Sequence, residues 1–187
     1  MIEAIDIVKS FDGIRVLDHV NATFADGKVN MIIGQSGSGK TVLLKSLLGI
    51  HTIDSGRIEY DGRNLPKMKE KEVRYEMLNC EDAEYIIVAY GSSSRIAMKA
   101  MQMAREKGIK VGLFRLITLF PFPTKQLAEV AKHVKGILCV EMSAGQMIED
   151  VRLATACGVK TEHFGRFGGI IPTPGEVLDA LENKIIK

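Results

Sequence analysis

The sequence predicts an α/β fold in two parts, and three observations lead to this prediction. Residues 29–48 read VNMIIGQSGSGKTVLLKSLL, a short apolar run followed by a glycine-rich turn and a helical pattern. From Asp82 onward, apolar strand patterns alternate with amphipathic helix patterns, as in a parallel sheet covered on both faces. Between these regions, residues 67–76 (KMKEKEVRYE) are mostly charged, which predicts a linker or an exposed helix turn. We therefore expect a first part at 1–66, a charged junction at 67–76 and a second part at 77–187.

The first predicted elements are two strands joined by a turn. Residues 2–8 alternate apolar and polar side chains, and residues 14–24 do so again, which is typical of half-buried strands. The FDG sequence between them reads as a turn. On the second strand, alternation predicts that Val16, Val20 and Phe24 share a buried face.

A phosphate loop (P-loop) pattern follows these strands. A strand predicted at Met31–Ile33 leads into the spacing G-x4-G-K-T, and a helix follows it, which is the context that this motif requires. Glycines let successive N–H groups point at one anion, and the helix start adds the positive end of its dipole. Lys40 would reach the β- and γ-phosphate oxygens of ATP, and the Thr41 hydroxyl would hold Mg²⁺. The alternative is an ordinary Gly/Ser turn that caps a helix. The predicted nucleotide-binding residues of the loop are Gly34, Gln35, Ser36, Gly37, Ser38, Gly39, Lys40 and Thr41.

The first part resembles a known family. After the helix, a short strand is predicted at Arg57–Tyr60. The order VKSFDGIRVLDHVNATFADGKVNMIIGQSGSGKTVLLKSLLGIHTIDSGRIEYDGRNLP resembles the N-terminal part of the ATP-binding cassette (ABC) transporter ATPases, over about residues 2–74. The resemblance implies a partial nucleotide-binding domain with ATP and Mg²⁺ as ligands and Gly34–Thr41 as its Walker A loop. It also places Phe11 where the family has an aromatic that stacks on adenine, although the pattern alone favours a core aromatic at a strand end.

The later motifs of that family do not follow. No glutamine stands between Gln35 and Gln102, where the glutamine loop is expected, and no apolar run ends in the Asp-Glu pair of a Walker B strand. Ser143–Gln146 (SAGQ) looks like a degenerate signature loop, but a buried strand pattern precedes it at Gly136–Glu141. Because Ser143 and Gln146 also fit a capping box at a helix start, we favour that interpretation.

The second part alternates strands and helices in regular order. The predicted strands are residues 85–90, 110–114 and 136–140, and the helices begin near residues 91–94, 124, 146 and 173. At the last of these starts, the sequence TPGE forms a capping box with proline at the first helical position. This order predicts a parallel sheet with right-handed crossovers, covered on both faces.

Four stretches of the second part carry another resemblance. They are DAEYIIVAYGSSSRIAMKAM, IKVGLFRLITLFPFP, VEMSAGQMIEDVRLA and FGRFGGIIPTPGEVLDAL. Over about residues 73–187, they resemble the C-terminal domain of the α subunit of 2-oxoacid:ferredoxin oxidoreductases, 2-oxoisovalerate type included. This domain is similar to the C-terminal domain of transketolases. The resemblance implies a family that decarboxylates a 2-oxoacid on thiamine diphosphate, passes electrons through iron–sulfur clusters and makes an acyl-CoA.

The cofactors of that chemistry are expected elsewhere. The resemblance implies that thiamine diphosphate binds to an earlier domain of the subunit and to a partner subunit. Iron–sulfur clusters need cysteines in groups, whereas Cys80, Cys139 and Cys157 are widely spaced. We therefore expect that the second part binds neither cofactor itself and that other oxidoreductase subunits are its partners.

Two places in the second part can hold an anion. Residues 91–94 follow a strand and begin a helix, where open α/β sheets bind ligands, so Ser92 and Ser93 are candidate contacts. A helix cap is the favoured alternative there. Arg166, in the sequence GRFGG, can grip a phosphate or a partner's carboxylate.

Three further polar residues, one glutamate and two histidines, are considered as possible functional groups. Glu141 ends an apolar strand beside a serine, where its carboxylate is either functional or a cap. His133 and His163 read as surface or loop histidines, because neither has a metal ligand at suitable spacing.

Composition limits the function classes. A net charge of +2 gives no sign of a nucleic-acid or membrane surface. No apolar run approaches the roughly 20 residues of a membrane span, and the first four residues, MIEA, do not read as a signal peptide. Three scattered cysteines suit a reducing compartment, so we expect a cytoplasmic protein.

Two truncated resemblances to unrelated families indicate a composite chain. The leading hypothesis is an ATP-binding P-loop fused to an oxidoreductase subunit domain, with no catalytic residues of its own and no complete catalytic cycle. One alternative is an ABC-type ATP-binding protein. The other is an oxidoreductase subunit domain that works only with its partner chains.

Overall fold

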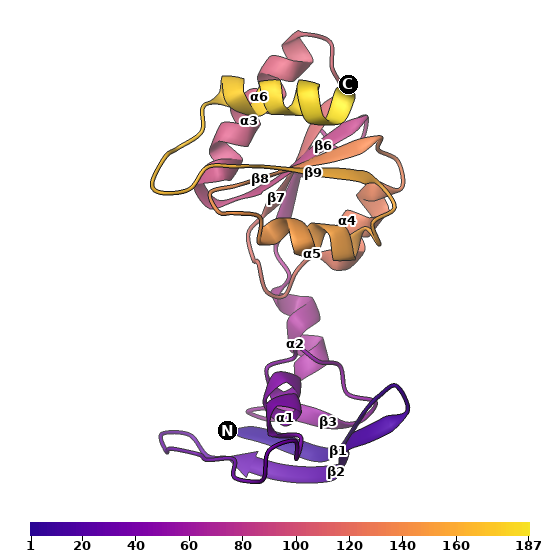
Figure 1. Ribbon diagram of the computed structural model, residues 1–187, viewed down its shortest axis with the longest axis vertical. Helices are drawn as coiled ribbons and strands as arrows, with labels where there is room; N and C mark the ends of the chain where they lie inside the picture. The colour runs from indigo at the N-terminus through magenta and orange to yellow at the C-terminus, as the bar shows by residue number, and fades with distance from the viewer. The chain divides into compact units, whose positions relative to one another are not determined.

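The computed structural model describes residues 1–187, which form two compact units, Met1–Glu72 and Val73–Lys187. Figure 1 shows the elements of both units. Tyr75 and Glu76, at the end of the predicted junction, lie in the second unit because both belong to a strand. No helix of the chain is both long enough and apolar enough to cross a bilayer.

The first unit is an antiparallel sheet with helices against it. Strand order is β2-β1-β3-β4, and one face of the sheet packs on α1 through a core that includes Ile7, Leu17 and Leu43. Three of the four predicted strands and the helix after the P-loop are confirmed. The elements are β1 (Ile2–Phe11), β2 (Ile14–Phe24), α1 (Lys40–Leu47), β3 (Ser55–Tyr60), β4 (Arg63–Asn64) and α2 (Leu65–Glu72).

The predicted buried face of β2 is partly wrong. Leu17 is buried in the core, whereas Val16 lies outside it. Between the pairs Ile7↔Val20 and Lys9↔Leu17, β2 has one residue more than β1, so a bulge shifts the alternation of side chains. His19 adopts a positive φ of 50° at this bulge.

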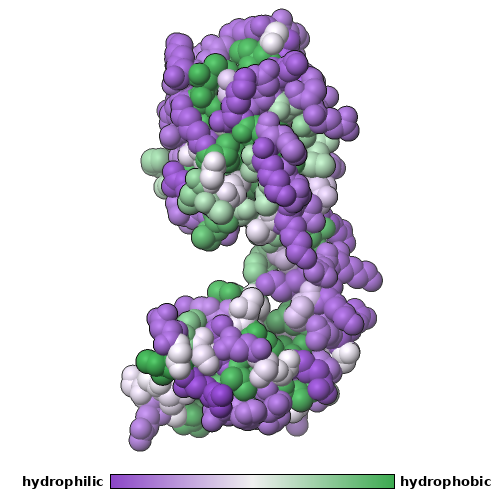
Figure 2. All heavy atoms as spheres, turned by 90° about the vertical axis from the view of Figure 1, so that its right-hand side faces the viewer, coloured by the Kyte–Doolittle hydropathy of each residue, from purple (hydrophilic) through white to green (hydrophobic).

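The strand predicted before the P-loop does not form. Residues 25–39 contain no strand, and the side chains of Val29, Met31 and Ile33 are 94%, 75% and 83% exposed. The apolar pattern has no neighbouring strand that could take up its backbone groups, and an isolated strand is not stable in water. Hydrophobic atoms accordingly reach the surface of this unit in Figure 2.

The second unit is a five-stranded sheet in the order β5-β7-β6-β8-β9. Its strands are β5 (Tyr75–Leu78), β6 (Tyr85–Tyr90), β7 (Val111–Leu116), β8 (Gly136–Glu141) and β9 (Lys160–Gly165). The predicted parallel pairing holds for β7, β6, β8 and β9, while β5 pairs antiparallel with β7 at the edge. Neither β5 nor β9 was predicted, because both are short edge strands without a continuous apolar run.

Helices cover both faces of this sheet, as predicted. One face packs against α3 (Gly91–Glu106), α6 (Pro174–Leu181) and a π-helical turn (Glu182–Ile186). The other packs against α4 (Thr124–Ala131) and α5 (Met147–Ala154). Two buried clusters result, one on each side of the central strands β6 and β8, whose side chains alternate between them. The capping box at Thr173 is also confirmed.

Candidate functional site

The P-loop residues are brought together at the start of α1. Gly37 and Gly39 have φ values of 80° and 86°, which favour glycine. A Cβ at Gly39 would lie 3.0 Å from the carbonyl oxygen of Val16, so a larger residue at this position would force the loop or β2 to move. The loop thus packs its last glycine against β2.

Lys40 points into its own loop. Its Nζ donates hydrogen bonds to the carbonyl oxygens of Gly34 at 2.7 Å and Gln35 at 2.5 Å. The first N–H groups of a helix have no acceptor within the helix, so α1 offers donors at the same place. The Lys40 ammonium and the N–H groups of α1 are donors that can bind an anion. To bind a phosphate, Lys40 would have to give up its hydrogen bonds to the carbonyls of Gly34 and Gln35. Thr41 is exposed at the helix start.

Phe11 is not the core aromatic that its pattern favours. Its side chain is 39% exposed at the end of β1. The Lys9 ammonium lies 5.1 Å from the ring centroid, and the His51 ring meets the aromatic edge-on at 5.3 Å. The ring is exposed because β1 ends in a tight turn beyond the core cluster.

A buried carboxylate is the most strongly connected polar group of the second unit. Glu141 is fully buried, and its two oxygens accept hydrogen bonds from the backbone N–H groups of Gln146, Met147 and Ile148 at 3.0 to 3.3 Å. The Ser143 hydroxyl donates to the same carboxylate. Glu141 therefore caps α5, where a negative charge also complements the helix dipole.

The capping box predicted at Ser143 is consequently wrong. Gln146 is the N-cap residue of α5, and no side chain of the predicted box caps the helix. Ser143 instead donates to Glu141, which supplies the acceptor from the end of the preceding strand. A glutamate directly after a buried apolar strand and before a helix start is the sequence signal for this arrangement.

His163 is not a loop residue, because it lies on β9 and faces Glu141. Its Nε2 is 3.5 Å from a Glu141 oxygen, yet this buried nitrogen makes no hydrogen bond. The ring passes under Gly165, where a Cβ would lie 2.6 Å from it. His133, in contrast, is exposed as predicted.

The serines at the start of α3 do not cap it. Tyr90 is the N-cap residue, and no side-chain cap is formed. Ser93 is buried, Ser92 is exposed, and the Ser94 hydroxyl donates to the carbonyl of Gly91. The favoured helix-cap interpretation is therefore wrong, because no serine side chain accepts a hydrogen bond from the helix N-terminus and the Ser94 hydroxyl instead donates one within the first turn.

The cysteines lie in three different environments. Burial raises the pKa of the Cys80 thiol to about 11 and that of the buried Cys139 thiol still further, so both thiols are protonated at neutral pH. Cys157 is exposed. No group of three or more His, Cys, Asp or Glu side chains is arranged to hold a metal ion.

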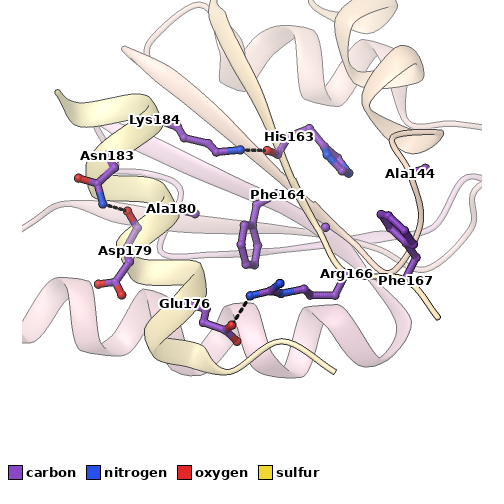
Figure 3. Close-up of a pocket in the computed structure, with 11 residues that line it drawn as sticks. Ala144, His163, Phe164, Arg166, Phe167, Glu176, Asp179, Ala180, Asn183 and Lys184 are labelled. Carbon is purple, nitrogen blue, oxygen red and sulfur yellow. Dashed lines mark hydrogen bonds and ion pairs between the residues drawn. The ribbon is translucent and has the colours of Figure 1, made fainter. Parts of the chain in front are cut away.

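Arg166 lies at a cavity beside β9. The guanidinium forms an ion pair with Glu176 at 2.5 Å (Figure 3). The pKa of Glu176 is lowered, first by the hydrogen bond from the backbone N–H of Thr173 and then by that from Arg166. The cavity has a volume of about 620 Å³ and is lined by Ala144, His163, Phe164, Gly165, Arg166, Phe167, Glu176, Asp179, Ala180, Asn183 and Lys184.

Known oxidoreductase subunits are similar to this chain. The ketoisovalerate oxidoreductase subunit VorB of Methanothermobacter marburgensis is 43% identical over 135 residues, which are 70% of this chain and 38% of that protein. The 2-oxoglutarate synthase subunit KorA of the same organism is 33% identical over 54% of this chain and 27% of its own length. The chain thus spans less than half the length of the curated relatives it matches.

A solved structure shows the same fold. It is the 2-oxoglutarate:ferredoxin oxidoreductase of Magnetococcus marinus, with a TM-score of 0.57 and 21% identity over 64% of this chain and 21% of that one.

The resemblance to ABC ATPases also has a counterpart among known proteins. The ribose import ATP-binding protein RbsA of Bacillus cereus is 29% identical over 153 residues, which are 78% of this chain and 29% of that protein. Both resemblances noted in the sequence are therefore shown. Residues 83–177, more than half of the chain, match the family described as pyruvate:ferredoxin oxidoreductase core domain II, and the chain belongs to this family.

Proposed function

We propose that residues 73–187 act as one domain of a 2-oxoacid:ferredoxin oxidoreductase subunit, and that the chain alone completes no catalytic cycle. The observation that carries this proposal is the match of residues 83–177 to pyruvate:ferredoxin oxidoreductase core domain II, and the role of Glu141 agrees with a structural contribution. Glu141 is the one fully buried carboxylate of the unit, and its two oxygens are taken up by the α5 N–H groups and Ser143. The unit is thus a scaffold whose strongest polar cluster is structural.

The cofactors of the reaction would bind to partner domains. Support comes from the thiols, since Cys80, Cys139 and Cys157 lie in separate environments and cannot together ligate a cluster. The length comparison agrees, because VorB extends well beyond the region that this chain matches.

Complementation tests this proposal. The chain is co-expressed with the other oxidoreductase subunits and a VorB that lacks the matching stretch, and ketoisovalerate-dependent reduction of ferredoxin is measured. We expect no turnover from the purified chain alone and restored turnover in the co-expressed assembly. Turnover by the partner-free chain would contradict the proposal, as would an assembly that stays inactive while full-length VorB restores activity.

A second candidate function is nucleotide binding by the first unit. Lys40, the α1 N-terminus and the loop glycines are the groups that favour it. We propose weak binding of Mg-ATP at Gly34–Thr41, with Phe11 beside the base and Thr41 on the metal ion. Hydrolysis is expected to be negligible, because in-line attack needs a positioned water and charge stabilisation from motifs that the sequence lacks.

Calorimetric titration of Mg-ATP tests this second function. Lys40→Ala should abolish binding, because it removes the ammonium that faces the loop. Ser143→Ala should leave binding unchanged, since Ser143 contacts Glu141 in the other unit. Equal loss of binding in both variants would instead identify Ser143–Gln146 as a nucleotide-contacting signature.

A further inference from the structure

We propose that the loop of residues 167–172 is a docking surface for the part of a VorB-like subunit that lies outside the region matched by this chain. This inference rests on the proposed oxidoreductase function and names the residues of contact. The loop follows β9 and reads FGGIIP. Its Phe167, Ile170 and Ile171 are 67%, 59% and 62% exposed, three large apolar side chains within five residues.

The ends of the loop are held in place. At one end, Arg166 pairs with Glu176, and at the other, Thr173 exchanges hydrogen bonds with the same glutamate in the capping box of α6. Between them, Gly168 and Gly169 adopt positive φ values of 71° and 83° and turn the chain. With its ends fixed, the loop presents its apolar side chains outward instead of folding them into the core.

A cavity lies directly beside the loop. Phe167 contributes to its rim, and Phe164 points into it from β9, as Figure 3 shows. A volume of about 620 Å³ lies in the range of pockets that admit whole side chains or small ligands. A projecting apolar loop next to a cavity with an aromatic wall is the arrangement of an interface core, into which a partner can insert an apolar side chain.

The comparison with VorB and the composition of the loop indicate the occupant. VorB has more than half of its length outside the region that this chain matches, and in our proposal this part of such a subunit covers the exposed loop. Residues 167–175 contain no charged side chain, which suits an apolar protein surface and not a nucleic acid. Neighbouring exposed apolar side chains of this size often mark a protein interaction site.

Co-purification tests the interface. The full chain, carrying a tag, is co-expressed with VorB lacking the matching stretch, and affinity and amide hydrogen exchange are measured on the product. We expect a complex in which the amides of residues 167–171 exchange more slowly than in the free chain. The double variant Phe167→Ser/Ile171→Ser should weaken binding by roughly 30-fold or more, as loss of an interface hot spot does.

Leu153→Ser is the matched control. Leu153 is 77% exposed near the end of α5, which packs on the face of the sheet opposite α6, so its replacement should leave the affinity unchanged. Failure to co-purify, unchanged exchange at the loop, or equal weakening by the control would each overturn the proposal. Measuring ferredoxin reduction by the same complexes separates the two proposals. If the complex depends on the loop but shows no turnover, only the proposed oxidoreductase function is refuted. If turnover is the same with the double variant as with the unchanged chain, only the proposed interface is refuted.

Discussion

Glu141→Ala is expected to destabilise the second unit by about 4 kcal/mol. The substitution leaves three backbone N–H groups at the buried start of α5 without acceptors and removes the negative charge that complements the helix dipole. It also opens a space between the end of β8 and the start of α5, where the carboxylate now lies. Urea unfolding, followed through exchange of the Ile86–Val88 amides in the central strand, measures the change in free energy.

Two milder variants separate the carboxylate from its neighbours. Ser143→Ala removes one of its donors and should cost about 1 kcal/mol. Glu141→Gln keeps the size and one acceptor oxygen and should fall between the two. A loss below about 1 kcal/mol for Glu141→Ala would show that the cap does not hold α5 in place.

The strands with continuous apolar runs could be predicted from the sequence. The segments YIIVAY and GILCVE became β6 and β8, since a strand buried on both faces needs apolar side chains at every position. The strand β9, KTEHFG, has no such run. It lies at the edge of the sheet, where polar side chains remain partly exposed, so only its pairing with β8 reveals it.

The strand predicted before the P-loop shows the opposite error. The residues VNMII have a strong preference for a strand, but preference alone does not supply a partner for the backbone. The sheet of the first unit pairs β1 with β2 and β3, and none of its strands pairs with residues 29–33. The predicted turn does form at residues 36–39, and Lys40 and Thr41 begin α1 directly after it.

The polar centre of the second unit was only partly predictable. Glu141 was noted as a candidate cap or functional group, and the structure shows the cap. The prediction that Ser143 and Gln146 cap α5 was wrong, because these residues match a capping box only in their spacing. His163 could not be placed beside Glu141 without knowing that β9 pairs with β8.

We expect the second unit to fold on its own, whereas residues 29–39 around the P-loop belong to no strand of the sheet in the first unit. Residue-resolved amide hydrogen exchange on the whole chain tests this claim most directly. Amides of Ile86–Val88 and Ile137–Val140 should be protected at least ~10³-fold more than those of Met31–Ile33, because the former lie in inner strands of a five-stranded sheet and the latter pair with no strand. Equal protection across residues 29–48 and 85–140 would contradict the account.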